Sequence, residues 1–186
     1  ANVTPMDQPT ANSLTTLPIS AIQQWFLNAY DGNKNHYNQS LLLSPIHPVS
    51  FDNLVQTLVV LVNHHFTLRH KFVNDGRQWF QYQRESENTV NSAFITQHSL
   101  QKVELQDVAE LDIEEAITLK CDQIQAGFNI ENGYLFKVVL FQLPNKQQRV
   151  LFVGHHLICD AVSWRIILSD FAIIYPLIEK SKNIKP

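Results

Sequence analysis

The stretch "HHLICDAVSWRIILSDF" (155–171) places two adjacent histidines and a carboxylate between two apolar segments. Before it, "GYLFKVVLFQL" (133–143) and "RVLFVG" (149–154) are rich in β-branched and aromatic residues, which predicts two adjacent antiparallel strands. After it, apolar residues recur at spacings of three and four, which predicts a buried helix that begins just after Asp160. The two histidines are therefore expected in a loop that joins a buried strand to a buried helix.

Short local signals predict other elements. Ser20 and Ser50 are placed to cap helices, because each precedes apolar residues at helical spacing. The segment 37–43 predicts a strand, and Asp75-Gly76 predicts a hairpin turn between two further strands. Helices and strands are thus mixed along the chain, which favours an α/β fold.

The two ends of the chain lack the apolar periodicity of the rest, and one more helix start is predicted between them. Residues 1–16 are polar, contain two prolines and show no periodicity, so we expect a linker or tail there and a second tail at 181–186. Asp112, with Glu115 three residues later, predicts a capping box at the start of another helix.

The composition fits one globular domain and excludes several classes of protein. The chain has 186 residues, 45% hydrophobic and 17% charged, with a net charge of −3, which gives no electrostatic footprint for nucleic acid or an anionic membrane. No apolar run is expected to reach the ~20 residues of a membrane span, and no signal peptide opens the chain. Cys121 and Cys159 are too few for a disulfide scaffold, so a reducing cytoplasm is expected.

The residue types around His155 and His156 allow three kinds of role. A histidine at the end of a strand can act as a general base near neutral pH, and Asp160 can either bond an imidazole or pair with a distant cation. A purely structural histidine pair is the second role. A metal site that adds Cys159 is the third, but adjacent strand residues point to opposite faces, so both histidines could hardly bind one ion.

The stretch 155–171 resembles the HHxxxDG signature of the condensation-domain superfamily of nonribosomal peptide synthetases, and its continuation "VSWR" (162–165) is most similar to epimerization domains. Four other stretches agree in order: "PISAIQQWF" (18–26), "HYNQSLLL" (36–43), "HHFTLRHKF" (64–72) and "QAGFNIENGYLFKVVLF" (125–141). The resemblance implies one lobe, over residues 17–180, of a chloramphenicol-acetyltransferase-like fold, a two-layer sandwich in which helices pack on a mixed sheet.

The resemblance also assigns roles to residues. His156 matches the catalytic base and His155 a structural histidine, while Asp160 matches an aspartate that forms a buried ion pair with the arginine at Arg69. Removing either ion-pair partner would cost roughly 3–5 kcal/mol. The family pattern also explains the histidines beside Arg69, so no metal site is predicted. Candidate residues for the lining of the substrate cleft are Asn38, Gln39, Ala161 (in place of the usual glycine), Ser163, which is also expected to cap the last helix, and Trp164, which its spacing places in the core.

An epimerization domain would invert the Cα of an aminoacyl or peptidyl group, from L to D, while a peptidyl carrier protein holds that group as a thioester on its 4'-phosphopantetheine arm. The resemblance implies no cofactor on the chain itself, and neither a nucleic acid nor a membrane as partner. It also implies that a second lobe supplies an opposing glutamate, so the chain alone is expected to be inactive.

Three other hypotheses remain open at this point. A condensation-domain lobe would use His156 to assist attack of an acceptor amine on a thioester. A docking module would recognise a carrier protein or a partner enzyme without chemistry. A self-paired enzyme would complete its site with a second copy of the chain, as the related chloramphenicol acetyltransferases do.

Overall fold

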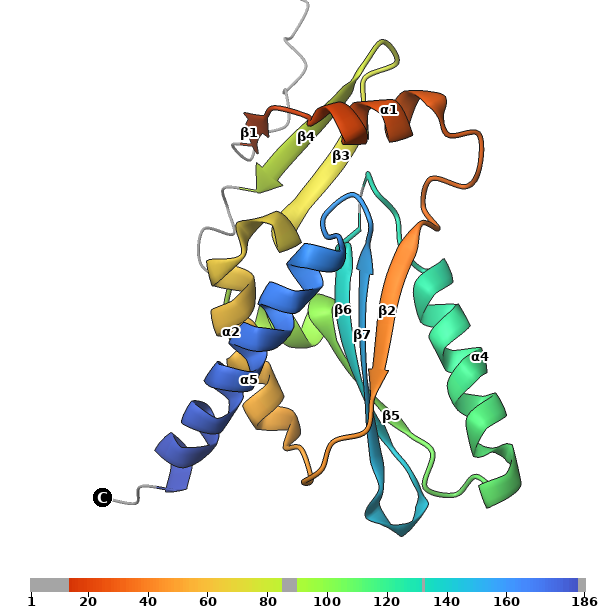
Figure 1. Cartoon of the computed structure of the whole chain (residues 1–186), viewed down its shortest axis with the longest axis vertical. Coiled ribbons are helices and arrows are strands. Elements are labelled where there is room, and N and C mark those ends of the chain that lie inside the picture. The colour runs from red at the N-terminus through yellow and green to blue at the C-terminus, as the bar shows by residue number, and fades with distance from the viewer. Residues whose placement is uncertain (1–13, 85–89, 132, 184–186) are drawn as a thin grey trace, which may run out of the picture.

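A computed structural model describes residues 14–84, 90–131 and 133–183. Its centre is a four-stranded mixed sheet (Figure 1). The strand order is β2 (Asn38–Leu43), β7 (Gln148–His155), β6 (Phe136–Gln142) and β5 (Leu100–Glu104). The pairs β2–β7 and β6–β7 are antiparallel, which confirms the predicted pairing of the two strands before the histidines.

Strands β5 and β6 are parallel, so the chain between them has to cross over the sheet. Helix α4 (Ile113–Ala126) makes this crossover and lies beside β2 in Figure 1. On the other side of the sheet, α2 (Phe51–His64) packs along α5 (Ala161–Asn183). Strands β6 and β7 are consequently buried on both faces, and their side chains form the centre of the core.

A second, three-stranded sheet lies beside the histidine end of the central sheet. Its order is β1 (Leu14–Leu17), β4 (Trp79–Arg84) and β3 (His70–Asn74), all antiparallel, and α1 (Ala21–Ala29) lies next to it in Figure 1. The β3–β4 hairpin turns at Gly76, whose φ of 91° suits glycine, as Asp75-Gly76 predicted.

Several short helical segments join these elements. They are a 3₁₀ turn at Phe66–Arg69, α3 (Ser92–Phe94) continuing into a π-helical turn at Ile95–Ser99, and 3₁₀ turns at Glu110–Asp112 and Pro144–Lys146.

Two of the four predicted helix caps are confirmed, those at Ser20 and Ser50. Ser20 and Gln23 form a full capping box at α1, and the Ser50 hydroxyl accepts a hydrogen bond at the start of α2. The capping box predicted at Asp112 is wrong, because α4 begins there without a hydrogen bond to that side chain.

The predicted boundaries of the lobe need correction at both ends. Strand β1 begins at Leu14, so the last residues of the expected linker pair with β4, and residues 1–13 lie outside the described part of the chain. At the other end, α5 continues past Pro176 and ends at Asn183, inside the expected tail.

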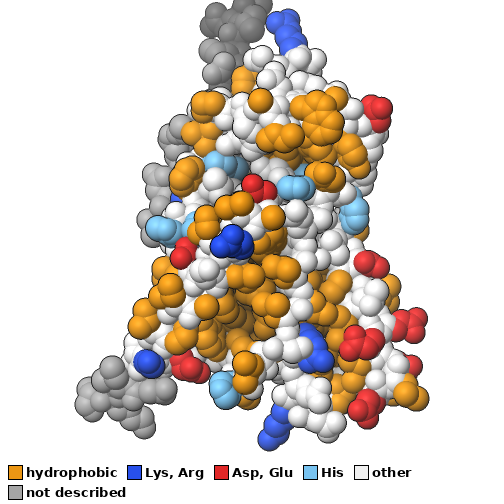
Figure 2. Space-filling model, viewed as in Figure 1, with side chains coloured by type: hydrophobic (Ala, Val, Ile, Leu, Met, Phe, Trp, Pro, Cys, Tyr) orange, Lys and Arg blue, Asp and Glu red, His pale blue; other side chains and the backbone are white. Residues whose placement is uncertain are grey.

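Helix α5 packs the face that its periodicity predicted, with Trp164 and Ile167 buried and Leu168, Phe171 and Ile174 against the core, but it is not buried on all sides. It exposes an apolar stripe of residues that share one helical face, and Figure 2 shows hydrophobic side chains gathered along this helix. The stripe consists of Val162, Ile166, Ile173 and Leu177. By length and composition alone, Ala161–Ser181 is apolar enough to cross a membrane, with a mean hydropathy of 1.5 and 11% of that stretch buried. The expectation that no apolar run reaches this length was therefore wrong.

An exposed apolar stripe favours association, so we expect the isolated chain to self-associate reversibly at high concentration. Ile173→Glu combined with Leu177→Glu should shift sedimentation velocity profiles toward monomer, because both side chains are at least 60% exposed. Thr118→Glu with Gln123→Glu on α4 adds the same charge elsewhere and should leave association unchanged. A wild-type chain that stays monomeric at all concentrations would contradict this expectation.

Candidate active site

The turn after β7 borders an open cavity of about 400 Å³. One wall comes from α1 and the other from the histidine turn and the first turn of α5. The lining residues are Ser20, Ile22, Gln23, Trp25, Phe26, Tyr37, His156, Leu157, Ile158, Cys159, Asp160 and Ser163. The cavity is therefore largely apolar, with one imidazole and one carboxylate at its rim.

The ring of His156 is fixed by contacts on its face and at both nitrogens. Tyr37 stacks on it with ring centroids 5.1 Å apart, and the Tyr37 carbonyl accepts a backbone hydrogen bond from His156 N (2.8 Å). Nδ1 lies 2.8 Å from the carbonyl oxygen of Cys159, which requires a proton on Nδ1. In the neutral ring, Nε2 therefore carries the lone pair, which is the arrangement of a general base.

A side-chain amide and an indole orient that lone pair. The Gln39 Nε2 atom lies 3.3 Å from Nε2 of His156, and the Trp164 indole donates to Gln39 Oε1 (3.0 Å). Because the indole can only donate, it fixes the Gln39 amide with its NH₂ group toward the imidazole. Gln39 and Trp164 thus position His156, although neither is among the residues that line the cavity.

His155 is fully buried, and both of its ring nitrogens bond to backbone atoms. Its Nε2 donates to the Lys34 carbonyl (2.8 Å), and its Nδ1 accepts from the Leu157 backbone amide (3.1 Å). Burial, followed by the nearby His156 and His36, lowers the pKa of His155 to about 4, although the Lys34 hydrogen bond opposes this shift. His155 is therefore neutral near pH 7 and locks the turn to the loop after α1.

Glycine is needed at position 154, because the side chains of Cys159 and Trp164 pack where a β-carbon would lie. A Cβ there would lie 2.8 Å from Cys159 Sγ and 3.3 Å from the Trp164 ring. Burial, and secondarily Asp160, raises the pKa of the Cys159 thiol to about 12. The thiol donates weakly to the His155 carbonyl (3.5 Å), and its raised pKa keeps it in the neutral thiol form near pH 7.

The expected ion pair between Asp160 and Arg69 is wrong. Asp160 is exposed, and its Oδ1 accepts hydrogen bonds from Ser163 N (2.8 Å) and Ser163 Oγ (2.7 Å), which lower the pKa of this carboxyl. Arg69 is buried at the end of the 3₁₀ turn that precedes β3, and no ion pair joins the two within residues 14–84, 90–131 and 133–183. Asp160 caps α5, so its loss should cost about 1 kcal/mol rather than 3–5.

The other candidate residues divide between the cavity and its surroundings. Ser163 lines the cavity, but it donates to the Asp160 cap and is not itself the cap that was expected. Ala161 is exposed at the start of α5, and Trp164 is buried in the core, as its spacing indicated. Asn38 points away from the cavity, where its amide donates to the Gln125 carbonyl of α4 (3.0 Å).

Sequence reasoning missed the aromatic and polar contacts that α1 makes with the turn. Gln23 Nε2 donates to the Leu157 carbonyl (2.8 Å), and Phe26 stacks on Tyr37 at 4.8 Å, which in turn stacks on His156. Trp25 lies at the cavity rim and is 60% exposed. The available signals were the position of Tyr37 just before the Asn38-Gln39 pair and the family-like stretch "PISAIQQWF" (18–26), which did not indicate that α1 contacts the turn.

Two buried neutral histidines make the stability of this fold depend on pH. Burial, and then the neighbouring Arg69, lowers the pKa of His70 to about 4, the same value as for His155. The unfolded chain binds these protons near pH 6.5, so the free energy of unfolding should fall from pH 6.5 toward pH 4.5, by up to about 1.4 kcal/mol per pH unit for each histidine. Urea titrations would measure this slope, and His155→Gln should make it shallower. An equal slope in that variant would exclude His155 as a source.

The chain was compared with protein families and with individual proteins. A family model described as the condensation domain matches residues 13–186. One of the linear gramicidin synthase proteins of Brevibacillus parabrevis is 32% identical over 98% of this chain, and surfactin synthase subunit 1 of Bacillus subtilis (strain 168) is 31% identical over 89%. This chain spans only 3% and 4% of their respective lengths.

Solved structures share the fold. The epimerization domain from the third module of tyrocidine synthetase B superimposes with a TM-score of 0.79 at 25% identity, covering 94% of this chain and 37% of that chain. The starter condensation domain of rhizomide synthetase gives 0.72 at 19% identity, covering 90% and 39%. The family match spans nearly the whole chain and includes the histidine turn, so this chain belongs to the condensation domain family of nonribosomal peptide synthetases.

Proposed function

We propose that this chain is the N-terminal lobe of an epimerization domain, which inverts the Cα of a carrier-bound aminoacyl or peptidyl thioester from L to D. The observation that carries the proposal is the fixed imidazole of His156, whose Nδ1 faces the Cys159 carbonyl, so that the lone pair of the neutral ring lies on Nε2, where the Gln39 amide contacts it at 3.3 Å and substrate would have to displace that contact. The likeness to the tyrocidine synthetase epimerization domain and the "VSWR" and "YNQS" stretches support it.

The chemistry needs one base at the start. Nε2 of His156 takes the Cα proton, and the electron pair of the broken C–H bond moves toward the thioester carbonyl, giving an enolate. A proton returned to the opposite face of Cα gives the D product, so the reaction consumes no net proton. The thioester lowers the pKa of the Cα proton, and the oriented imidazole would hold Nε2 close to that proton.

Return of the proton needs a second acid, and the one carboxyl group among the cavity's described lining residues is poorly suited to that role. Among its lining residues, Asp160 carries the carboxylate, and the hydrogen bonds from Ser163 lower the pKa of this group, so it stays ionised and is a poor proton donor near pH 7. We therefore assign the second acid to the other lobe. This chain covers 37% of the matching epimerization-domain chain, which leaves length for such a lobe.

The partner in this proposal is a peptidyl carrier protein with a 4'-phosphopantetheine arm. The arm brings the thioester to the cavity, and the exposed Ile22 and Trp25 at the rim offer apolar surface to it. The chain itself needs no bound cofactor for the proton transfer.

A condensation-domain lobe is the alternative within the same family. Solved condensation domains share this fold, and Nε2 of His156 would accept the proton of an acceptor amine with the same geometry. Epimerization exchanges the Cα proton without an acceptor, whereas condensation requires a second, amine-bearing carrier.

Deuterium wash-in tests the proposal directly. A carrier protein loaded with an L-aminoacyl or peptidyl thioester is incubated in heavy water with the chain, alone and joined to the second lobe of an epimerization domain. We expect label and D product with both lobes, and a loss of about 10²–10⁴-fold in His156→Ala. Peptide bond formation with an added aminoacyl carrier, without Cα label, would favour condensation. Carrier binding without either reaction would indicate a docking module, and activity of the chain alone would indicate self-pairing.

Two neighbouring residues on β2 provide a matched pair for the role of Gln39. Gln39→Ala removes the amide that contacts His156, so the exchange rate in the two-lobe enzyme should fall about tenfold. It also leaves the buried Trp164 indole without its acceptor, so stability should fall by about 1–3 kcal/mol. Asn38→Ala removes a contact with α4 instead and should keep the exchange rate. Equal effects of the two variants on exchange would contradict a positioning role for Gln39.

A further inference from the structure

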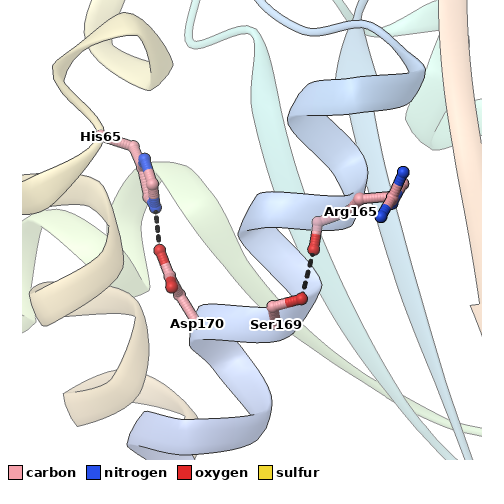
Figure 3. Close-up of polar contacts among 4 residues, drawn as sticks. All are labelled: His65, Arg165, Ser169 and Asp170. Atoms are coloured by element: carbon pink, nitrogen blue, oxygen red, sulfur yellow. Dashed lines mark hydrogen bonds and ion pairs between the residues drawn. The ribbon is translucent and has the colours of Figure 1, made fainter.

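A second group of polar side chains lies where α2 ends beside α5, and none of its members lines the His156 cavity. His64 ends α2, His65 follows as its C-terminal cap, and Asp170 faces them from α5. His65 Nε2 and Asp170 Oδ2 are 2.7 Å apart (Figure 3). One ligand atom from each of the three residues lies within 4.8 Å of the other two.

Adjacent residues rarely present both side chains to one point, but here the backbone turns between them. His64 is the last helical residue, whereas His65 has φ −92° and ψ 79°, outside the helical region. Their rings consequently lie close, with centroids 4.7 Å apart and planes at 83°. Asp170 completes the group although it lies 105 residues beyond His65 in the sequence.

The electrostatic surroundings favour a cation at this point. Asp170 supplies a carboxylate, and the C-terminal end of α2 carries the negative end of the helix dipole. Arg165, which precedes Asp170 on α5, directs its guanidinium away from the His65–Asp170 pair in Figure 3. His64 is exposed, and the side chains of His65 and Asp170 are 18% and 31% exposed, so solvent can reach the group and supply a further ligand.

We propose that His64, His65 and Asp170 bind a divalent transition metal ion, with Zn²⁺ as the best-fitting one. Two imidazoles, one carboxylate and an open position for water match the ligand types and number of three-residue zinc sites. Ligand atoms of a tetrahedral zinc ion with bonds of about 2.0–2.1 Å lie about 3.4 Å apart, so small side-chain rotations would bring this group to that spacing. On binding, His65 would give up its hydrogen bond to Asp170, with any ring proton on the binding nitrogen moving to the other nitrogen or to solvent.

Such an ion would tie α2 to α5 at the end of α2. It would reinforce the packing of two helices on one side of the sheet, at a site independent of the proposed proton transfer. The sequence alone predicted no metal site here, because the family pattern explained His64 and His65 and nothing placed Asp170 beside them.

Titration calorimetry of the chelator-treated chain with ZnCl₂ tests the proposal, with CoCl₂ as a spectroscopic probe of tetrahedral coordination. We expect one ion per chain, weaker binding at lower pH because protons compete for the imidazoles, and at least about tenfold weaker binding in His64→Ala and in Asp170→Asn. His47→Ala removes an exposed histidine outside the group and should bind as the wild type does.

Two results would overturn the proposal. Absence of zinc binding to the wild-type chain would leave His65 and Asp170 as a hydrogen-bonded pair between two helices. Equal affinity in the wild type, His64→Ala and Asp170→Asn would assign any binding to other histidines. Because the His64 side chain is exposed, its removal should preserve the fold, and circular dichroism of each variant would verify this.

Discussion

The buried imidazole of His155 is the constraint on which the site depends. It joins the Lys34 carbonyl to the Leu157 amide, so the loop after α1 and the turn after β7 are tied through a single neutral ring. Because successive side chains of a strand alternate, burying His155 turns the next ring, that of His156, toward Tyr37 and the cavity. His155 thus sets the direction of the His156 ring, and its own ring must stay uncharged to remain in the core.

Around this anchor, each contact settles a different property of His156. The Cys159 carbonyl selects the tautomer, the Gln39 amide fixes the ring plane, and Gly154 leaves room for the sulfur and indole behind it. The carboxylate nearby is occupied with capping α5 and contributes helix stability instead of proton chemistry. The described part of the chain therefore holds the His156 ring in one orientation, with the lone pair of the neutral ring on Nε2.

The sequence predicted those parts of the fold that local chemistry determines. Serine caps, the Asp75-Gly76 turn and the β6–β7 pair follow from residues that are close in sequence. Strand β5 was missed because "LQKVE" buries only two of its five side chains and shows no strict alternation. The Gln39–Trp164 hydrogen bond and the contact of Asp170 with His65 join residues more than 100 positions apart in the sequence. Local spacing patterns cannot predict such contacts. The ion pair between Asp160 and Arg69, which the resemblance implied, does not form in the described residues. The Asp160 carboxylate instead accepts hydrogen bonds from Ser163, three residues away.

The exposed stripe on α5 also affects how mutations of this chain would be interpreted. Apolar side chains that remain in water contribute little to the free energy of folding, since that contribution comes from area removed from solvent. A mutational scan scored by stability of the chain alone would class Ile173 and Leu177 as tolerant positions. The same substitutions scored in an assembly that covers α5 would appear among the most damaging. The difference between the two scans would map the partner's footprint residue by residue, without a structure of the complex.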